Sequence, residues 1–336
     1  MARARNVIGR YPTSVQQLKR LSSASCELWV KRDDLTSDLY GGNKVRKLEE
    51  ILHAARERQA KRIVTIGAAG SHHVLATTIH ATRAGFRVAA LLTPQPYGER
   101  AEENLRAAVG QGLDAHPVAH LASLPWTLSR MLRAGDYFVP PGGSSVVGSL
   151  GYFAAAHELI GQVEQGVLPM PDLIVVPLGS GGTAAGLLAG LVSARFRGTL
   201  LAVRIVPPWL MGRLRTVALA RAVLEKAGGS GSLQELRRHL RVDGAYLGDG
   251  YGFPSAAGAR ATTLASEEGL VIEPTYTAKA FAAALDRVTV GEHRRVLYWH
   301  TFSSAPLQPL LVGAPSISEL PPGLRSLLQI VRKPSA

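Results

Sequence analysis

Lys44 stands where a glycine-rich turn, Gly41-Gly42-Asn43, leads into a predicted helix over residues 44–59. In the first turn of a helix, the free backbone N–H groups and the helix dipole disfavour the ammonium form of a lysine. A lysine with a lowered pKa is the nucleophile that Schiff-base chemistry with a carbonyl compound requires. Many lysines beside a glycine pair are merely exposed loop residues, so this feature alone only suggests such chemistry.

A second glycine-rich turn follows the apolar segment 172–177 and precedes a predicted helix over 183–195. It consists of Gly179, Ser180, Gly181, Gly182 and Thr183. Such a turn exposes backbone N–H groups at a helix N-terminus, where phosphate binds well. It lacks the full G-x-G-x-x-G and Walker patterns and could also be a tight packing turn. Together with Lys44 it indicates pyridoxal 5'-phosphate, a cofactor that needs both a Schiff-base lysine and a phosphate site.

Short apolar segments alternate with helical segments along most of the chain. The predicted strands cover residues 27–31, 62–66, 87–92, 172–177, 200–206 and 296–300. The predicted helices cover residues 44–59, 72–84, 99–110, 183–195, 256–268 and 277–288, with arginine-rich helices over 211–240. Nearly continuous apolar strands separated by helices indicate an α/β protein with mostly parallel twisted sheets and helices on both faces. The tail from Ala314 onward is expected to be an appendage with one short helix.

The composition narrows the possible classes of protein. A chain of 336 residues is long enough for two domains or one large α/β unit. Its single cysteine, Cys26, excludes an internal disulfide and a cysteine zinc cluster, which suits a reducing cytoplasm. The formal charge is +13, yet the basic residues are scattered and form no stripe interleaved with aromatics. We therefore expect solvated helix faces and no nucleic-acid partner.

The uncharged segment 173–194 is long enough to cross a bilayer. Its centre is the turn at 179–183, whose polar backbone would be left unpaired in lipid. A strand, a turn and a buried helix explain the segment better, so we expect a soluble protein that does not insert into a membrane.

The two glycine-rich turns belong to a longer series of motifs. Residues 31–49 and 179–183 resemble fold-type II pyridoxal-phosphate enzymes, and in particular the 1-aminocyclopropane-1-carboxylate deaminase / D-cysteine desulfhydrase family. Segments 140–152, 250–254 and 273–279 match the same pattern in the same order, so the resemblance runs from about residue 11 to residue 301. It implies a two-domain fold similar to the tryptophan synthase beta chain. It also places the basic N-terminal residues in the fold, so they are not expected to be a transit peptide.

The resemblance implies roles for particular residues. Lys44 would hold the cofactor as a Schiff base and shuttle the α-proton of the substrate. Lys47, one helical turn further on, would bind the phosphate together with the backbone of residues 179–183. Ser71 would orient the substrate carboxylate or assist proton transfer. Tyr251 and Tyr276 would be two active-site tyrosines, one near the ring of the cofactor and the other near the substrate. Thr301 would lie beside the cofactor.

Two segments depart from the family pattern. His72 stands where the family usually has the asparagine that binds the 3'-oxygen of the cofactor, and an imidazole N–H could replace it. His72 and His73 could equally be packing residues at a helix start, and no zinc-ligand pattern accompanies them, so no metal is expected. Where the family often has His-Thr-Gly-Gly, this chain has Phe302-Ser303 in place of the two glycines. Either the floor under the pyridine ring is altered, or the backbone does not approach it closely.

Thr277 bears on the type of reaction. After the second tyrosine the deaminase pattern has a glutamate, whose carboxylate would keep the pyridine nitrogen protonated. The hydroxyl of Thr277 activates the ring less, which suffices for expelling a good β-leaving group but not for opening a cyclopropane. Thr277 thus favours desulfhydrase-like α,β-elimination from D-cysteine or a related small amino acid, giving a 2-oxo acid and ammonia.

We expect a molecule of two domains. A small inserted α/β domain should cover residues 48–158, and residues 1–47 plus 159–336 should form the large domain that binds pyridoxal phosphate. The resemblance suggests a homodimer acting on a small amino acid. Three other activities remain open: 1-aminocyclopropane-1-carboxylate deamination, racemisation or β-replacement through the same carbanion, and pyridoxal-phosphate binding without turnover.

Overall fold

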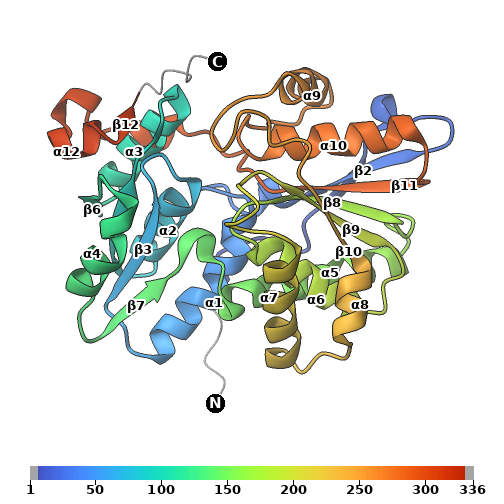
Figure 1. Ribbon diagram of the computed structural model, residues 1–336, viewed down its shortest axis with the longest axis horizontal. Helices are drawn as coiled ribbons and strands as arrows, with labels where there is room; N and C mark the ends of the chain where they lie inside the picture. Colours follow the sequence, from blue (N-terminus) through green and yellow to red (C-terminus); the bar gives the residue numbers. More distant parts are fainter. Residues whose placement is uncertain (1–6, 330–336) are drawn as a thin grey trace. The chain divides into compact units, whose positions relative to one another are not determined.

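The computed structural model describes residues 7–329, and this part of the chain folds into two units (Figure 1). Unit 2 consists of residues 9–47 and 144–305. Within the described residues, unit 1 consists of residues 48–143 together with residues 7–8 and 306–329. These units differ from the expected domains in three places: residues 144–158 fold with unit 2, whereas residues 7–8 and 306–329 fold with unit 1. Arg3 and Arg5 of the basic N-terminal segment lie outside the described residues.

Unit 2 is built on a six-stranded sheet of order β1-β2-β11-β8-β9-β10. Its strands are β1 (Val15–Gln17), β2 (Glu27–Arg32), β8 (Leu173–Leu178), β9 (Thr199–Arg204), β10 (Leu240–Asp243) and β11 (Arg295–His300). All neighbours are parallel except β1 and β2. In Figure 1 the blue β2 and the red-orange β11 lie side by side, although they come from opposite ends of the sequence. The sheet thus brings the residues after β2 next to the residues after β11.

Helices cover both faces of the unit 2 sheet, as the apolar strands predicted (Figure 1). One face carries α5 (Val146–Glu164), α6 (Gly182–Ser193), α7 (Arg213–Lys226) and α8 (Leu233–His239). The other face carries α9 (Ala256–Glu267) and α10 (Thr277–Val290). Strand β11 shows the alternation: Leu297 and Trp299 pack toward α5 and α6, whereas Val296 and Tyr298 pack toward α10. Cys26 is buried in the second core and serves as a packing residue.

Unit 1 contains a parallel four-stranded sheet of order β6-β4-β3-β7. Its elements are β3 (Arg62–Ala68), β4 (Arg87–Thr93), β6 (Leu113–Pro117), β7 (Asp136–Val139), α2 (His72–Arg83), α3 (Glu99–Gly110) and α4 (Leu124–Met131). Ile66 of β3 packs against α4, and its neighbour Thr65 bonds His73 of α2, so these helices cover opposite faces. Helix α1 (Asn43–Glu57) starts in unit 2 and continues into unit 1.

The C-terminal segment is part of unit 1, and its description as an appendage is wrong. Strand β12 (Leu328–Gln329) pairs with β5 (Gln95–Pro96), and the side chain of Arg106 bonds the carbonyl of Pro315. Two short helices occur there instead of one, α11 (Gln308–Leu311) and α12 (Pro322–Arg325). Residues 330–336 lie outside the described residues.

The segment 173–194 forms β8, a turn and α6, as predicted. None of the helices in the described residues is long and apolar enough to cross a membrane. Helix α6 is instead buried among its neighbours in unit 2. At Gly186 a β-carbon would lie 2.3 Å from the carbonyl oxygen of Ser149 on α5, so the two helices approach as closely as glycine permits.

We expect Gly186→Ala to lower the free energy of unfolding by about 1–3 kcal/mol, because its methyl group overlaps α5. Gly161→Ala on α5 is the matched control, since its β-carbon position has no atom within 4 Å apart from its chain neighbours and the nearby backbone of its own helix. This control should raise stability by about 0.5–1 kcal/mol, because alanine loses less backbone entropy in a helix. Urea unfolding followed by circular dichroism measures both changes, and equal effects of the two variants would contradict the packing described.

Candidate active site

The two glycine-rich turns meet in unit 2. The Asn43 side chain donates a hydrogen bond to Thr183 Oγ1 (3.0 Å), and the Lys44 ammonium donates to Asn43 Oδ1 (2.6 Å). The Asn43 backbone N–H donates to the carbonyl of Thr301 (3.0 Å), which directly follows β11. The structure thus brings together Lys44, Thr183 and Thr301, three residues that the sequence placed in one site.

The amino group of Lys44 lies in a desolvated environment. Burial lowers the pKa of Lys44 to about 8, and the nearby negative charge of Glu273 partly opposes this shift. At pH 7 about a tenth of such a lysine is free amine, against less than about a thousandth of an ordinary lysine. The sequence predicted a lowered pKa from the helix start, but the main physical cause is burial.

A cradle of polar groups lies beside the second turn, and it consists of Lys47, Ser144, Ser180 and Gly182. Lys47 is 2% exposed, and its ammonium donates to Ser144 Oγ (3.4 Å). Ser144 Oγ also contacts Ser180 Oγ (2.7 Å) and accepts from the backbone N–H of Gly182 (3.0 Å). The pKa of Lys47 is well below its ordinary value because of burial and the charge of Lys44. An anion held here would favour the ammonium form of Lys47.

The shape of this cradle fits a phosphate group. Gly181 has φ +90°, which favours glycine, and it turns the backbone into the start of α6. A β-carbon on Gly182 would lie 2.7 Å from Ser144 Oγ and 3.0 Å from Lys47 Nζ, so a side chain there would fill the cradle. Backbone N–H groups at a helix start, two hydroxyls and a buried lysine are the groups that bind phosphate. The residues present therefore fit pyridoxal 5'-phosphate. Ser144 was not assigned a role from the sequence, although it lies in a segment that matched the family.

The two predicted tyrosines are in contact. Tyr276 OH donates to Tyr251 OH (2.7 Å), and their rings meet edge to face with centroids 5.6 Å apart. Burial raises the pKa of both hydroxyls. Tyr276 also lies against the second turn, because a β-carbon on Gly179 would be 2.9 Å from its ring. The loop before Tyr251 is fixed by Lys279, whose ammonium donates to the carbonyls of residues 247 and 250.

Glu273 is a buried carboxylate that the sequence analysis missed. It is 6% exposed and accepts hydrogen bonds from the backbone N–H groups of residues 275, 276 and 277. It therefore holds the start of α10, including Tyr276, in one conformation. Its charge also acts on Lys44. The available signal was an acidic residue directly before a proline at a predicted helix start.

The hydroxyl of Thr277 is occupied within its own turn. It accepts from the backbone N–H of Glu273 (2.7 Å) and lies 3.2 Å from Glu273 Oε1. Thr277 is 1% exposed. Its assignment to the cofactor stays a prediction, whereas its role in holding Glu273 follows from these bonds.

Phe302 and Ser303 stand where the family often has two glycines, and the backbone of residues 301–302 nevertheless lies close to that of Gly42. A β-carbon on Gly42 would lie 2.7 Å from the carbonyl oxygen of Thr301 and 2.9 Å from that of Phe302. Gly42 has φ +85°, so glycine is favoured on this side of the contact. Ser303 Oγ accepts from the N–H of Gly41 (2.8 Å), a hydrogen bond that glycine could not make. Gly42 therefore makes the close backbone contact possible, and Ser303 adds a hydrogen bond between the two segments.

Ser71 and His72 lie in unit 1, at the start of α2. Ser71 caps the helix, with its hydroxyl accepting from the backbone N–H groups of His73 (3.2 Å) and Val74 (3.4 Å). His72 Nδ1 lies 3.1 Å from the Nδ2 of Asn104, which also donates to the carbonyl of Gly70 (2.9 Å). Because Nδ2 is a donor, Nδ1 of His72 must accept and the ring hydrogen must be on Nε2.

His73 is a packing residue rather than a ligand. Its ring bonds Thr65 Oγ1 (2.8 Å) and Thr77 Oγ1 (3.3 Å), and it is buried. Within residues 7–329 no three histidine, cysteine or acidic side chains are grouped so as to hold a metal ion.

Comparison with known proteins agrees with the chemistry of this site. Residues 8–301 match the family model described as "Pyridoxal-phosphate dependent enzyme". The chain therefore belongs to the pyridoxal-phosphate dependent enzyme family, and its cofactor is pyridoxal 5'-phosphate. The fold is the two-unit α/β fold of the fold-type II enzymes.

Three relatives narrow the place of the chain in that family. It is 37% identical to a nocardicin C-9' epimerase from Nocardia uniformis subsp. tsuyamanensis, over 82% of this chain and 86% of the relative. It is 34% identical to a D-cysteine desulfhydrase from Salmonella typhi, over 86% of this chain and 91% of the relative. Its structure is similar to that of an ACC deaminase homologue, with a TM-score of 0.76, 27% identity, and 91% and 95% of the two chains covered. The chain is a pyridoxal-phosphate dependent enzyme related to D-cysteine desulfhydrase and to an ACC deaminase homologue.

The pKa of Lys44 can be measured on the cofactor-free protein. Acetylation by acetic anhydride across a pH series, followed by peptide mass spectrometry, should give a midpoint for Lys44 near pH 8. Glu273→Gln should move this midpoint downward, because the carboxylate favours the ammonium form. Glu267→Gln on α9 is the matched control, since Glu267 is exposed, and it should leave the midpoint in place. An upward shift in Glu273→Gln would contradict the electrostatic role of Glu273.

The tautomer of His72 is a second measurable property. Asn104→Leu removes the donor to His72 Nδ1 and to the Gly70 carbonyl, and it should cost about 1–3 kcal/mol of stability. In the wild type, ¹⁵N NMR should show the His72 hydrogen on Nε2, and the variant should show a mixture of tautomers. The signals of His73 serve as the internal control, because its partners Thr65 and Thr77 are unchanged. A His72 hydrogen on Nδ1 in the wild type would overturn the assignment.

Proposed function

We propose that the protein catalyses α,β-elimination on a small amino acid, with D-cysteine as the leading substrate. Cysteine and water would yield hydrogen sulfide, a 2-oxo acid and ammonia. The observation that carries this proposal is the desolvated amine of Lys44 beside a phosphate cradle, with a tyrosine pair next to the cradle. The 34% identity with a D-cysteine desulfhydrase supports the choice of substrate.

Lys44 would act at the α-carbon. Pyridoxal phosphate, when bound, supplies an electron sink for the negative charge that forms on that carbon. The Lys44 amine, with its pKa of about 8, would accept the α-proton and return to the ammonium form that Asn43 Oδ1 accepts from. Lys47, Ser144, Ser180 and the backbone of residues 181–183 would hold the phosphate.

The tyrosine pair and the start of α2 would handle the substrate. Because Tyr251 accepts its hydrogen bond from Tyr276, its own O–H can donate to the departing sulfur. Ser71 uses its oxygen as an acceptor for α2, so its O–H can donate to the substrate carboxylate. The Nε2–H of His72 would replace the asparagine amide toward the 3'-oxygen, and Thr277 and Thr301 would complete the surroundings of the ring.

A second candidate, epimerisation at the α-carbon, is favoured by the 37% identity with an epimerase. It needs the same proton removal but no loss of a β-substituent. Deamination of 1-aminocyclopropane-1-carboxylate is disfavoured, because the position after Tyr276 carries the hydroxyl of Thr277 and this hydroxyl is bound to Glu273. Cofactor binding without turnover would use the free amine of Lys44 only to form the Schiff base.

We further propose that the enzyme works in the cytoplasm as a homodimer and that residues 9–47 and 144–305 form the domain that binds the cofactor. The location in the cytoplasm is supported by the single buried cysteine, because a chain without a disulfide does not need an oxidising compartment. The cradle of Lys47, Ser144 and Ser180, all in unit 2, supports the last. Analytical ultracentrifugation measures the oligomeric state directly.

Turnover in deuterium oxide distinguishes the candidate reactions. With D-cysteine, we expect sulfide, a 2-oxo acid and ammonia in equal amounts. Deuterium entering the α-position of a recovered amino acid of inverted configuration, without ammonia, would favour epimerisation.

Lys44→Ala should lose at least about a thousandfold in rate, because it removes the proton acceptor as well as the cofactor link. Lys61→Ala, at a surface position in unit 1, is the control and should retain full activity. No products from a panel of D- and L-amino acids would sink the catalytic proposal.

A further inference from the structure

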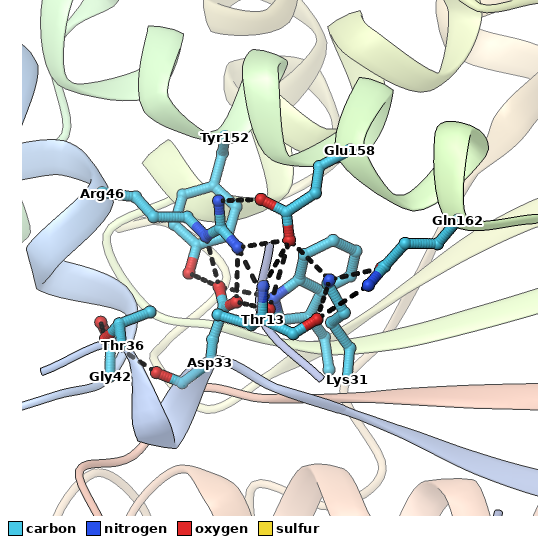
Figure 2. A network of polar contacts seen from close by, with 10 residues as sticks. Thr13, Lys31, Asp33, Thr36, Gly42, Arg46, Tyr152, Glu158 and Gln162 are labelled. Atoms are coloured by element: carbon cyan, nitrogen blue, oxygen red, sulfur yellow. Dashed lines mark hydrogen bonds and ion pairs between the residues drawn. The ribbon is translucent and has the colours of Figure 1, made fainter. Parts of the chain in front are cut away.

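We propose that Asp33 is the positioning residue that sets the orientation of the first turn of α1, and with it the directions of Lys44 and Lys47. This inference rests on the proposed role of Lys44. Asp33 lies just after β2 and is fully buried in a polar network of unit 2 (Figure 2). It does not contact Lys44 in any described bond; it acts through Arg46 on one side and Gly42 on the other.

The side chain of Asp33 fixes Arg46 from several directions. Its carboxylate accepts from Arg46 Nε (2.9 Å) and Nη2 (2.9 Å), a two-point contact that sets the guanidinium plane. It also accepts from Thr13 Oγ1 (2.9 Å), Tyr152 OH (2.7 Å) and Trp299 Nε1 (2.8 Å). Five hydrogen bonds leave little capacity for a reacting proton, and the contacts with Arg46 hold the pKa of Asp33 below its usual value in spite of burial. The carboxylate is thus suited to hold a position rather than to exchange protons.

The backbone of Asp33 fixes the residue before the helix. Its carbonyl accepts from the N–H of Gly42 (3.0 Å) and from the hydroxyl of Thr36 (2.9 Å). The same hydroxyl contacts the carbonyl of Gly42 (3.1 Å). The Asn43-Lys44-Val45 segment is therefore held between two attachments that both begin at Asp33.

Arg46 determines the rotation of α1 about its axis. Successive helical residues point about 100° apart, so fixing Arg46 toward Asp33 also fixes where Lys44 and Lys47 point. Lys47 follows Arg46 directly and contacts Ser144 in the cradle. On α5, a β-carbon on Gly151 would lie 2.1 Å from the carbonyl oxygen of Arg46, so the two helices touch at this residue. A turn of α1 away from Asp33 would take Lys44 and Lys47 out of the site together.

The rest of the network balances the buried charge. Glu158 accepts from Arg46 Nη1 (2.9 Å) and from Lys31 Nζ (2.5 Å), so two cations face two carboxylates. Lys31 also donates to the carbonyl of Thr13 (2.7 Å) and to Gln162 Oε1 (2.6 Å). Figure 2 shows these side chains converging on the Asp33–Arg46 pair from different segments. A buried ion cluster costs desolvation energy, and apolar residues of the same volume would often stabilise a fold as well. The ion cluster holds Arg46 in a single geometry, and an active site depends on such a fixed geometry more than a hydrophobic core does.

The test compares two buried aspartate–arginine pairs. Asp33→Asn keeps the size of the side chain but removes the charge that holds Arg46. Asp136→Asn is the matched control in unit 1, because Asp136 binds Arg62 through two bonds (2.9 and 2.6 Å) and both side chains are largely buried. Both variants should melt at lower temperature, whereas only Asp33→Asn should alter Lys44.

The readout is the acetylation midpoint of Lys44 in the cofactor-free protein, measured well below the melting temperature. In Asp33→Asn we expect the midpoint to rise by about one pH unit, because a loosened first turn admits water to the amine. Acetylation at pH 7 should then be about tenfold slower. In Asp136→Asn the midpoint should stay at the wild-type value. A folded Asp33→Asn protein with an unchanged midpoint would overturn the proposal.

A milder variant decides the question if Asp33→Asn does not fold. Tyr152→Phe removes one donor to Asp33 and keeps the ring that lies edge-on to Trp299. It should shift the Lys44 midpoint upward by a smaller amount, and an unchanged midpoint in this folded variant would also overturn the proposal. The readout needs neither bound cofactor nor turnover. Failure of the elimination assay with a shifted midpoint would therefore refute the proposed reaction alone.

Discussion

The site in unit 2 depends on one physical constraint, which is the desolvation of the Lys44 amine within rigid surroundings. Burial lowers the pKa of this amine to about 8. The charge of Glu273 limits the shift, and the Asn43 side chain accepts a hydrogen bond from the ammonium. A lysine held in this way can exchange a proton near neutral pH, which an exposed lysine does poorly.

Two buried carboxylates that support this arrangement each accept several hydrogen bonds. Glu273 is fixed by three backbone N–H groups, and Asp33 by five side-chain bonds. Both carboxylates are buried, and each holds the start of a helix that carries site residues, α10 and α1 respectively. Close glycine contacts complete the site, since Gly42 and Gly182 each lie where a β-carbon would collide with a neighbour. Rigidity here comes from directional bonds, which tolerate fewer alternative geometries than apolar packing does.

Much of this architecture could be predicted from local sequence. The apolar strands and the helices between them indicated the parallel sheets, and the two glycine turns indicated the cradle. Helix α5 was missed as a helix because its residues 146–164 are apolar on most sides and contain several glycines, which weakens the helical pattern. The short strands β6, β7 and β10 carry polar residues and depend on pairing with neighbours in the sheet.

The polar network could not be predicted, because it joins residues far apart in the sequence. Arg46 and Glu158 are separated by 112 positions, and Asp33 and Trp299 by 266. Lys31 and Asp33 lie in a segment recognised as part of the family pattern, yet their partners become visible only in the folded chain. Glu273 is similar, since its nearness to Lys44 depends on the sheet order that places α10 beside the end of β11.

Lys44, and no other lysine, should carry the cofactor in this site. Incubation of the purified protein with pyridoxal 5'-phosphate, followed by borohydride reduction and peptide mapping, identifies the lysine that reacts. We expect a single reduced pyridoxyl group on the peptide containing Lys44, located at Lys44 by fragmentation, and its loss in Lys44→Ala. A pyridoxyl group on Lys47 or on another lysine of the wild-type protein, or none at all, would show that Lys44 does not have this role.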